Sequence, residues 1–184
     1  CFHRFFVLMG KKIKMGIMTH NYPLAVLGAG TMGRGIAQVA ASAGHPVLLY
    51  DIVRKNTQDA IEFIGQRLED SFHKGKITKK IKGQVIKNIK PVQELDELNN
   101  AKLILEAVIE DLEIKQDLLC RVESVVGAES IMSTNTSSLD LKKIGKKVKR
   151  PERFVGLHFF NPVPVMALVE IIHMDETAPS VTKF

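Results

Sequence analysis

The sequence predicts an α/β protein built on a doubly wound, mostly parallel sheet, and two observations indicate this fold class. Short apolar segments of strand character alternate with helical segments from residue 24 to residue 172, which is the order of repeated β-α-β units. A glycine-rich turn, Gly28-Ala29-Gly30-Thr31-Met32-Gly33, joins the first strand to the first helix, as it does in Rossmann-like sheets. Such a sheet carries helices on both of its faces.

The individual elements are predicted from short apolar runs and from apolar residues at helical spacing. The expected strands are Leu24–Leu27, Val47–Tyr50, Leu103–Leu105, Ile131–Thr134, Arg153–His158 and Ala167–Ile172. The expected helices are Gly35–Ala41, Thr57–Phe72, the first part of a lysine-rich stretch that ends at Lys90, Leu112–Val125 and Leu139–Lys147. The residues that stand at strand ends are Asp51, Glu106, Ala107, Asn135 and His158. Because the carboxyl ends of parallel strands meet at one edge, these residues are expected to converge on one crevice.

The glycine-rich turn predicts a binding site for a dinucleotide. Gly28 permits the tight turn, Gly30 lets backbone approach a pyrophosphate, and Gly33 lets the helix pack on the strand. The N-terminus of that helix presents free N–H groups and the positive end of its dipole to the phosphates. Asp51 can accept hydrogen bonds from both ribose hydroxyls and would repel a 2′-phosphate, which favours NAD over NADP. Arg54, three residues on, is the feature that would suit NADP, and incidental glycines in an ordinary strand–turn–helix are the alternative interpretation.

Composition describes a globular protein with unevenly distributed charge. The 184 residues suffice for one substantial domain, and no apolar run reaches the length of a membrane span. Cys1 and Cys120 are too few for a disulfide framework, which indicates a reducing compartment, and the cytoplasm is expected in preference to the mitochondrial matrix. The net charge is +6, and seven lysines without an acid lie between Lys74 and Lys90. This run suits a solvated helical face; without interleaved aromatic residues it predicts no nucleic-acid partner.

The first twenty residues differ from the rest of the chain. The run Phe5-Phe6-Val7-Leu8-Met9 is shorter than the core of a signal peptide, and no small-residue cleavage site follows it. Residues 1–20 are therefore expected to be an extension outside the core and peripheral to function. The nucleotide-binding domain is expected to span residues 21–176.

A histidine and a glutamate form a second candidate site. His158 precedes Phe159-Phe160-Asn161-Pro162 at a strand end, and Glu170 lies twelve residues on in the next strand. Two adjacent strands can bring these side chains within hydrogen-bonding reach. A carboxylate on one imidazole nitrogen fixes the tautomer and raises the basicity of the other nitrogen, which makes a general base. From spacing alone, a structural histidine and a solvated glutamate are the alternative.

Four blocks of sequence together are similar to one family of enzymes. They are Gly28–Ala37, Glu106–Leu112, Asn135–Leu139 and Gly156–Met166. In this order and spacing they resemble the NAD-binding domain of the L-3-hydroxyacyl-CoA dehydrogenases, a family that includes the 3-hydroxybutyryl-CoA dehydrogenases. The resemblance covers residues 22–180. It implies NAD as the cofactor, an acyl-CoA as the substrate, and oxidation of the 3-hydroxyl to a ketone by hydride transfer to NAD.

The resemblance also implies roles for single residues. His158 matches the catalytic base, Glu170 its electrostatic partner, and Ser137 a hydroxyl beside the reacting oxygen, although a helix N-cap is an alternative role for Ser137. Contacts with the cofactor are implied for Gly28, Gly30, Thr31, Met32, Gly33, Asp51, Ala107, Glu110, Lys115, Ser137 and Asn161. Contacts with the substrate's coenzyme A part are implied for Lys74 and Ser137, and no metal is implied. The chain departs from the family pattern at Arg67, where some members use a serine for coenzyme A.

Members of this family continue into an all-helical domain that closes over the substrate and supplies most of a dimer interface. We expect this C-terminal helical domain to be absent from the 184 residues and residues 177–184 to be the start of its first helix, and we expect the full-length form to be a homodimer with no membrane partner. The 184-residue chain alone is expected to bind NAD and to turn over weakly or not at all. A non-catalytic NAD-binding or structural module, as in a crystallin, and a dehydrogenase of a free hydroxy acid are the alternatives. Glu110 and Lys115, without the family match, would be an exposed pair on a helix face.

Overall fold

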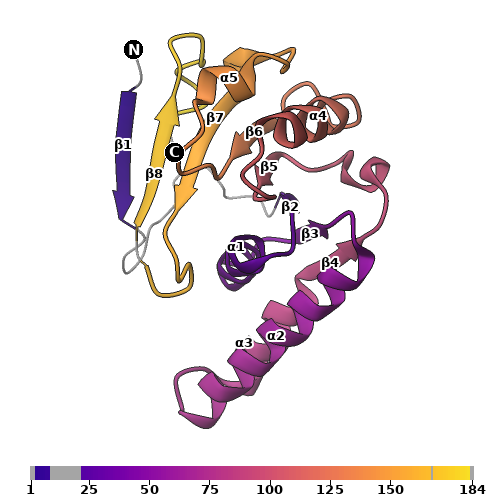
Figure 1. Ribbon diagram of the computed structural model, residues 1–184. Helices are drawn as coiled ribbons and strands as arrows, with labels where there is room; N and C mark the ends of the chain where they lie inside the picture. Colours follow the sequence, from indigo (N-terminus) through magenta and orange to yellow (C-terminus); the bar gives the residue numbers. More distant parts are fainter. Residues whose placement is uncertain (1–2, 9–21, 167, 183–184) are drawn as a thin grey trace.

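Within the residues that the structure describes, which are 3–8, 22–166 and 168–182, eight strands form one sheet in this computed structural model (Figure 1). The strands are β1 (His3–Leu8), β2 (Leu24–Leu27), β3 (Val47–Tyr50), β4 (Ile89–Val92), β5 (Leu103–Glu106), β6 (Ile131–Thr134), β7 (Phe154–Phe159) and β8 (Leu168–His173). The helices are α1 (Thr31–Ser42), α2 (Arg54–His73), α3 (Lys79–Lys87), α4 (Leu112–Glu123) and α5 (Leu141–Gly145), with short 3-10 turns η1 (Leu95–Leu98) and η2 (Pro151–Arg153).

The strand order in the sheet is β1-β8-β7-β6-β5-β2-β3-β4. Strands β4, β3, β2, β5, β6 and β7 all run parallel to one another. Strand β8 is antiparallel to β7. The order reverses between β2 and β5, and a crevice opens beyond the carboxyl ends of strands at such a point. The predicted fold class, a doubly wound and mostly parallel sheet, is therefore confirmed.

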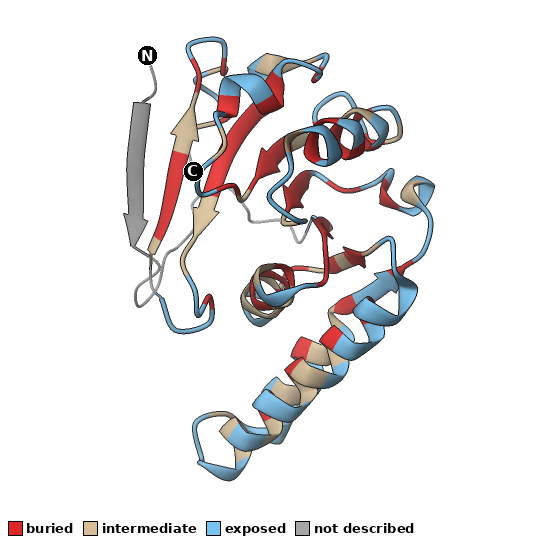
Figure 2. Ribbon diagram, in the orientation of Figure 1, coloured by how far each residue is buried: buried red, intermediate tan, exposed pale blue. Residues whose placement is uncertain are grey.

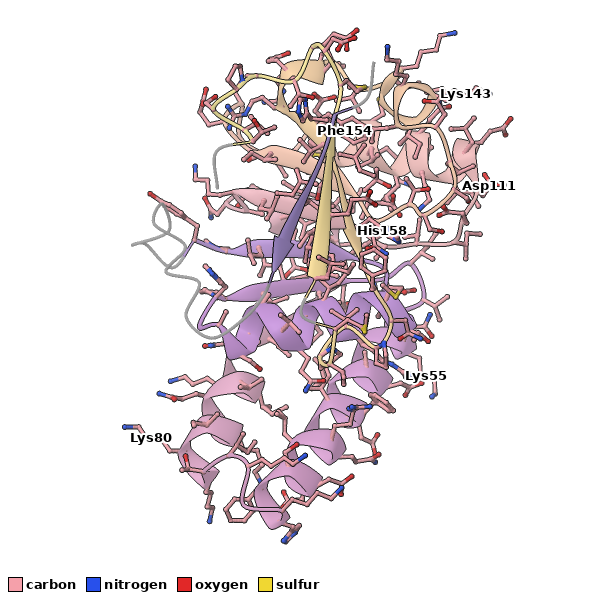
Figure 3. All side chains as sticks on the ribbon, turned by 90° about the vertical axis from the view of Figure 1, so that its left-hand side faces the viewer. Lys55, Lys80, Asp111, Lys143, Phe154 and His158 are labelled. Carbon is pink, nitrogen blue, oxygen red and sulfur yellow. The ribbon has the colours of Figure 1, made fainter. Side chains whose placement is uncertain are left out.

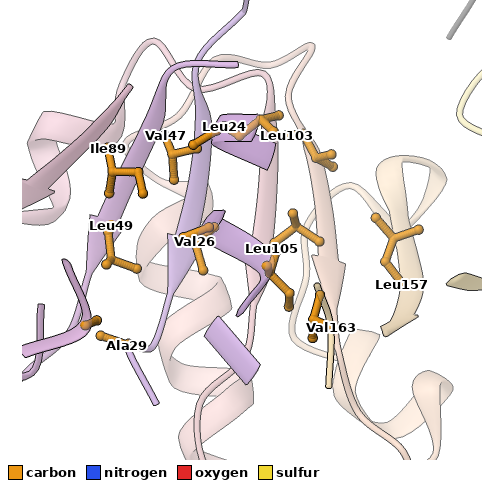
Figure 4. Packing of buried hydrophobic residues seen from close by; sticks show 14 of the residues in the cluster. Leu24, Val26, Ala29, Val47, Leu49, Ile89, Leu103, Leu105, Leu157 and Val163 are labelled. Carbon is orange, nitrogen blue, oxygen red and sulfur yellow. The ribbon is translucent and has the colours of Figure 1, made fainter. Parts of the chain in front are cut away.

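Alternate residues of the central strands pack on opposite faces of the sheet. On β2, Leu24 and Val26 belong to the core beneath α1, α2 and α3, whereas Ala25 and Leu27 belong to the core beneath α4 and α5. Figure 4 shows the first of these clusters, in which Leu49 and Leu105 from the neighbouring strands flank Val26. The central strands β2, β5 and β6 are mostly buried, whereas the outer faces of the helices are exposed (Figure 2). The sheet therefore separates two hydrophobic cores, one on each of its faces.

The predicted strands and helices are present, with some ends shifted by a few residues. Helix α1 begins directly after the glycine-rich turn, and the lysine-rich stretch divides into α3 and β4. Helix α5 is shorter than expected because the side chain of Asp140 caps it by accepting a hydrogen bond from Lys142 N, so the preceding residues form a turn. Ala167, the expected first residue of the last strand, lies outside the described residues.

Part of the segment that was expected to be peripheral takes part in the sheet. Strand β1 pairs antiparallel with β8 along its whole length, from His3 opposite His173 to Leu8 opposite Leu168. The other residues of that segment, 1–2 and 9–20, lie outside the described residues. The boundary that we predict at residue 20 stays a prediction.

At the other end of the chain, residues 175–182 form turns and bends, so the described part of the helix expected at 177–184 is not helical. Thr177 Oγ1 donates to Phe154 O at 3.0 Å, and Ala178 N donates to Glu152 O at 2.8 Å. These bonds tie the segment to the start of β7 and to the turn before it. The boundary at residue 176 stays a prediction.

The lysine-rich run lies on a helical hairpin that projects beyond the sheet. Helices α2 and α3 lie side by side, and Thr78 caps α3 by accepting from Ile81 N at 3.2 Å (Figure 1). Lys80 lies far from His158 (Figure 3). No helix among the described residues combines the length and the apolar character needed to cross a membrane. The same residues contain no group of three or more His, Cys, Asp or Glu placed to hold a metal ion.

Candidate active site

The glycine-rich turn has a geometry that only glycine allows at two positions. Gly28 has a φ of 99°, and a Cβ there would lie 2.7 Å from Ala107 O. A Cβ on Gly33 would lie 1.7 Å from Gly28 O, which confirms that α1 packs closely against the turn. A Cβ on Gly30 would meet no heavy atom within 4 Å apart from its chain neighbours. Gly30 therefore leaves open the space in front of the α1 N-terminus, where a pyrophosphate fits.

A cavity of about 840 Å³ lies beside this turn. Its walls come from the turn, from the end of β3 and from one face of α4, and include Gly28, Gly30, Thr31, Met32, Asp51, Ile52, Asn56, Ala107, Val108, Glu113, Ile114 and Asp117. Exposed apolar side chains among them, Ile52, Ile109 and Ile114, suit the flat face of a nucleobase. The cavity thus combines an apolar slot with the phosphate-binding turn.

The carboxylate of Asp51 is held in one orientation at the rim of the larger cavity. Asp51 Oδ2 accepts from Ala29 N at 2.8 Å, and Oδ1 accepts from Val53 N at 2.9 Å and from Asn56 Nδ2 at 3.0 Å. Arg54, which could have served a 2′-phosphate, instead pairs with Glu94 at 3.1 Å. The acid is therefore placed to meet a ribose, while the nearby cation is engaged elsewhere.

A second cavity, of about 300 Å³, adjoins the first. The two share Met32, Ala107 and Val108 as lining residues. The other residues that line the smaller cavity are Glu110, Lys115, Asn135, Ser137, His158, Phe159, Phe160 and Asn161. A dinucleotide with one half on the glycine-rich turn would therefore reach the smaller cavity with its other half, and the residues present fit such a ligand.

His158 and Glu170 are partners across β7 and β8. They occupy opposed positions in the register, and His158 Nδ1 lies 3.2 Å from Glu170 Oε2. The side chain of Glu170 is 7% exposed and that of His158 is 18% exposed. A carboxylate acceptor favours the tautomer with the proton on Nδ1, which leaves Nε2 as the basic nitrogen. The Phe160 ring packs 4.5 Å from the imidazole, between ring centroids. This geometry leaves an imidazole nitrogen that can accept a proton at the wall of the smaller cavity.

Glu110 organises the loop that carries Ser137. Its Oε1 accepts from Thr136 Oγ1, from Ser137 N at 3.1 Å, and from Ser138 N at 3.3 Å. Burial raises the pKa of Glu110, but the hydrogen bond from Thr136 and the charge of Lys115 outweigh it and lower the pKa to about 2. Glu110 is therefore ionised at neutral pH. Ser137 is not the N-cap of α5, because Asp140 has that position.

A buried ion pair lies behind Glu110. Lys115 Nζ is 2.7 Å from Glu106 Oε1 and 3.2 Å from Glu110 Oε2. The side chain of Lys115 is 1% exposed and that of Glu106 is 0% exposed, so the interpretation of Glu110 and Lys115 as an exposed helix-face pair is wrong. It fails because the carboxylate at the end of β5 draws the lysine inward. Sequence reasoning placed Glu106 at a strand end and gave it no role. The signal that could have pointed to its buried ion pair is an acidic residue at the end of an otherwise apolar strand.

Comparison with known proteins identifies the family. Residues 23–184 match the family model for the NAD-binding domain of 3-hydroxyacyl-CoA dehydrogenase. The chain belongs to this family. As the NAD-binding domain of a 3-hydroxyacyl-CoA dehydrogenase, it has NAD as its cofactor. The resemblance found in the sequence is thereby confirmed.

Two named enzymes are similar to this NAD-binding domain in sequence. The chain is 42% identical over 167 residues to the 3-hydroxyadipyl-CoA dehydrogenase of Escherichia coli K12, which is 91% of this chain and 35% of that protein. It is 40% identical over 153 residues to a 3-hydroxybutyryl-CoA dehydrogenase of Clostridioides difficile, which is 81% of this chain and 53% of that protein. The chain thus spans between about a third and about half of these relatives' lengths.

The fold of the NAD-binding domain is shared with solved structures. The crystal structure of (S)-3-hydroxybutyryl-CoA dehydrogenase from Ralstonia eutropha matches with a TM-score of 0.85 and 35% sequence identity, over 88% of this chain and 57% of that one. The crystal structure of 3-hydroxybutyryl-CoA dehydrogenase from Escherichia coli K12 matches with a TM-score of 0.83 and 40% identity, over 88% of this chain and 34% of that one.

The NAD-binding domain gathers most of the residues singled out in the sequence around its two cavities. The larger cavity has Gly28, Gly30, Thr31, Met32, Asp51 and Ala107, and the smaller one has Met32, Ala107, Glu110, Lys115, Ser137, His158 and Asn161. Gly33 packs behind the turn, and Glu170 lies behind His158. Lys74 lies in the turn after α2 and lines neither cavity, and Arg67 on α2 lies 5.8 Å from the centre of the Phe63 ring.

Asn135 links two of the strand ends that were expected to converge. Asn135, at the end of β6, uses Oδ1 to accept a hydrogen bond from Phe159 N at 2.8 Å. This bond ties the end of β6 to the residue that follows His158. Asn135 also lines the smaller cavity, so the two strand ends and the cavity wall form one unit.

Proposed function

We propose that this domain is the NAD-binding and catalytic half of an enzyme that oxidises the 3-hydroxyl of an acyl-CoA to a ketone, with His158 as the general base. The observation that carries the proposal is the His158–Glu170 pair at 3.2 Å, at the wall of a cavity that adjoins the glycine-rich turn. A domain that only bound the nucleotide would not need a polarised histidine there. The acyl-CoA substrate class is supported by the names of the relatives.

The larger cavity supports the binding half of the proposal. The α1 N-terminus would meet the phosphates, Asp51 would accept hydrogen bonds from the ribose hydroxyls, and the isoleucines would cover the base. NAD, when bound, supplies the hydride acceptor. The smaller cavity would hold the reacting half together with the substrate's 3-hydroxyl.

The residues of the smaller cavity support the catalytic half. His158 Nε2 would take the proton from the 3-hydroxyl, and the Glu170 carboxylate would stabilise the imidazolium that forms. Ser137 would donate a hydrogen bond to the substrate oxygen as negative charge develops on it. Glu110 would hold the Ser137 loop through the bonds from Ser137 N and Ser138 N.

We place the coenzyme A phosphates near Lys74, at the end of α2. The turn after α2 lies at the end of the α2–α3 hairpin that is remote from the sheet (Figure 1), and a long substrate could extend along the hairpin to reach it. Arg67, which lies about two helical turns before Lys74 on α2, offers a second cation that suits phosphate. The cytoplasm stays the proposed location.

The test is His158→Gln in the longest native polypeptide that contains this domain. With 3-hydroxybutyryl-CoA and NAD, we expect NADH formation to fall by roughly 10²- to 10⁴-fold, the range of general-base catalysis. The affinity for NAD, measured by calorimetry, should change by no more than about twofold because His158 contributes to chemistry and not to uniform binding. Unchanged turnover in the variant would refute the assigned base. A wild-type protein that bound NAD but oxidised no 3-hydroxyacyl-CoA would support the non-catalytic alternative.

A further inference from the structure

Glu106 is a buried carboxylate with no solvent contact and a full set of hydrogen-bond donors. Its Oε1 accepts from Val108 N at 2.7 Å and from Lys115 Nζ at 2.7 Å, and its Oε2 accepts from Thr134 Oγ1 at 2.6 Å. Hydrogen bonds therefore reach both carboxylate oxygens, and one of the donors is the ammonium group of Lys115. Glu106 is thus a fixed negative charge at the end of β5, beneath the crevice.

The charges around Glu106 do not cancel. The ammonium of Lys115 lies between the carboxylates of Glu106 and Glu110, at 2.7 Å and 3.2 Å. Two negative groups and one positive group give this cluster, which we call the acidic triad (Glu106, Glu110 and Lys115), a net charge of −1. Because Glu106 and Lys115 are out of contact with water, the field of the triad is screened less than that of a surface group.

The acidic triad faces the smaller cavity. Lys115 and Glu110 line it together with His158, and the glycine-rich turn lies beyond the shared wall at Met32. The proposed function places the nicotinamide half of the cofactor in this cavity. The nicotinamide ring carries a positive charge when it is oxidised and none when it is reduced. A net negative charge beside the ring therefore interacts with the two redox states differently.

We propose that Glu106 is a specificity-determining residue that makes the acidic triad net negative and so favours the oxidised over the reduced dinucleotide. This inference rests on the proposed function, which places the nicotinamide in the smaller cavity. The effect acts on the difference between two affinities and needs no contact between Glu106 and the ligand. By linkage, tighter binding of NAD⁺ than of NADH would lower the reduction potential of the bound cofactor.

A purely structural role for Glu106 makes a different prediction. The residue also connects β5 to α4 through Lys115 and to β6 through Thr134, so its loss could deform the cavity. Deformation would weaken both redox forms in parallel. The remaining ionisable pair at this cavity, His158 with Glu170, is left intact by changes at Glu106 and acts equally in every variant.

The test is the dissociation constants of NAD⁺ and NADH, measured by calorimetry for the native polypeptide and for Glu106→Gln. The amide matches the carboxylate in size and removes one charge. We expect the ratio of the NAD⁺ constant to the NADH constant to rise about tenfold, which corresponds to roughly 1.4 kcal/mol. The matched control is Glu106→Gln combined with Lys115→Met, which restores the net charge of −1. In this double variant the ratio should return to within about twofold of the wild-type value, even if both affinities fall.

Glu110→Gln is the second variant, because Glu110 is partly exposed and its replacement leaves the buried contact between Lys115 and Glu106 in place. It also removes one negative charge, so the ratio should move in the same direction. An unchanged ratio in Glu110→Gln, or a parallel loss of both affinities in Glu106→Gln, would overturn the inference while leaving NAD binding in place. A wild-type protein that bound neither nucleotide would instead overturn the proposed function.

Discussion

His158 and Glu170 face each other because β8 runs antiparallel to β7. The register pairs them directly, and the imidazole and the carboxylate meet at 3.2 Å. The other neighbours of β7 and of the central strands are parallel, and parallel strands need a long crossover before they can pair. The antiparallel return of β8 brings the acid back to the histidine after only twelve residues. The antiparallel pairing of β8 with β7 thus brings together the two residues of the proposed base.

Replacing Glu170 with glutamine should lower the rate of 3-hydroxyacyl-CoA oxidation by roughly 10²- to 10⁴-fold. The amide no longer stabilises the imidazolium and no longer selects the tautomer of His158. The measurement is kcat/KM with 3-hydroxybutyryl-CoA in the longest native polypeptide, together with the affinity for NAD, which should be retained. Glu62→Gln, at an exposed glutamate on α2, is the matched control and should leave kcat/KM unchanged. A Glu170→Gln variant as active as this control would contradict the role given to Glu170.

Gly30→Ala should weaken NAD binding, whereas Gly33→Ala should lower the stability of the fold. The new Cβ at Gly30 enters open space in front of the α1 N-terminus, so the fold is kept and NAD binding is weakened. The new Cβ at Gly33 collides with Gly28 O, so the fold itself is destabilised. Thermal unfolding and NAD calorimetry on both variants separate the two effects. Equal melting temperatures for Gly33→Ala and the wild type would show that the close packing of α1 on the turn is not needed.

Much of the fold could be predicted from the sequence because local signals agree with the tertiary structure. The glycine-rich turn, Asp51 and the apolar strands such as Leu103–Leu105 all indicated one sheet and one crevice. The pairing of His158 with Glu170 was accessible from their spacing on neighbouring strands. These features depend on short-range patterns, and the sheet then brings them together.

The acidic triad could not be predicted in the same way. Lys115 follows helical spacing that suits a solvated face, and only the three-dimensional position of Glu106 beneath α4 turns it inward. The role of Glu110 in holding Thr136 and Ser137 is likewise a contact across twenty-six or more residues. Buried polar contacts between distant segments leave little trace in composition or periodicity.

Asparagine at Asp51 should weaken the preference for NAD over NADP. The carboxylate would repel a 2′-phosphate, and the amide would not, so the ratio of NADP to NAD dissociation constants should fall about tenfold, or roughly 1.4 kcal/mol. Calorimetric titration with both cofactors measures it. Asp59→Asn, at an exposed carboxylate that pairs with Lys55 at 2.6 Å, is the control and should leave the ratio unchanged. A ratio that did not move in Asp51→Asn would show that the discrimination lies elsewhere.

Glu110 should make stability depend on acidity. Its pKa is lowered from 4.5 to about 2 in the fold, so the unfolded chain binds a proton more readily between these values. The contribution of Glu110 is present above about pH 4.5 and is lost as the pH falls toward about 2. Denaturant unfolding across this range should show a smaller loss of stability in Glu110→Gln than in the wild type. Parallel curves for the two proteins would contradict the ionic role of Glu110.

His45, in the loop between α1 and β3, should add a second dependence of stability on pH. Among the described side chains, His45 is buried with its Nδ1 lacking a hydrogen-bond partner, and burial lowers its pKa from 6.5. The unfolded chain therefore takes up the proton first, and stability falls as the pH drops below 6.5 toward the lowered value. His45→Phe removes this titration and also removes an unpaired polar atom, which costs about 1–3 kcal/mol when buried. We expect its unfolding free energy to be flatter with pH in that window. His73→Phe, at a histidine with an exposed side chain on α2, is the control and should keep the wild-type slope. The same slope in His45→Phe and the wild type would show that His45 does not titrate differently in the folded chain.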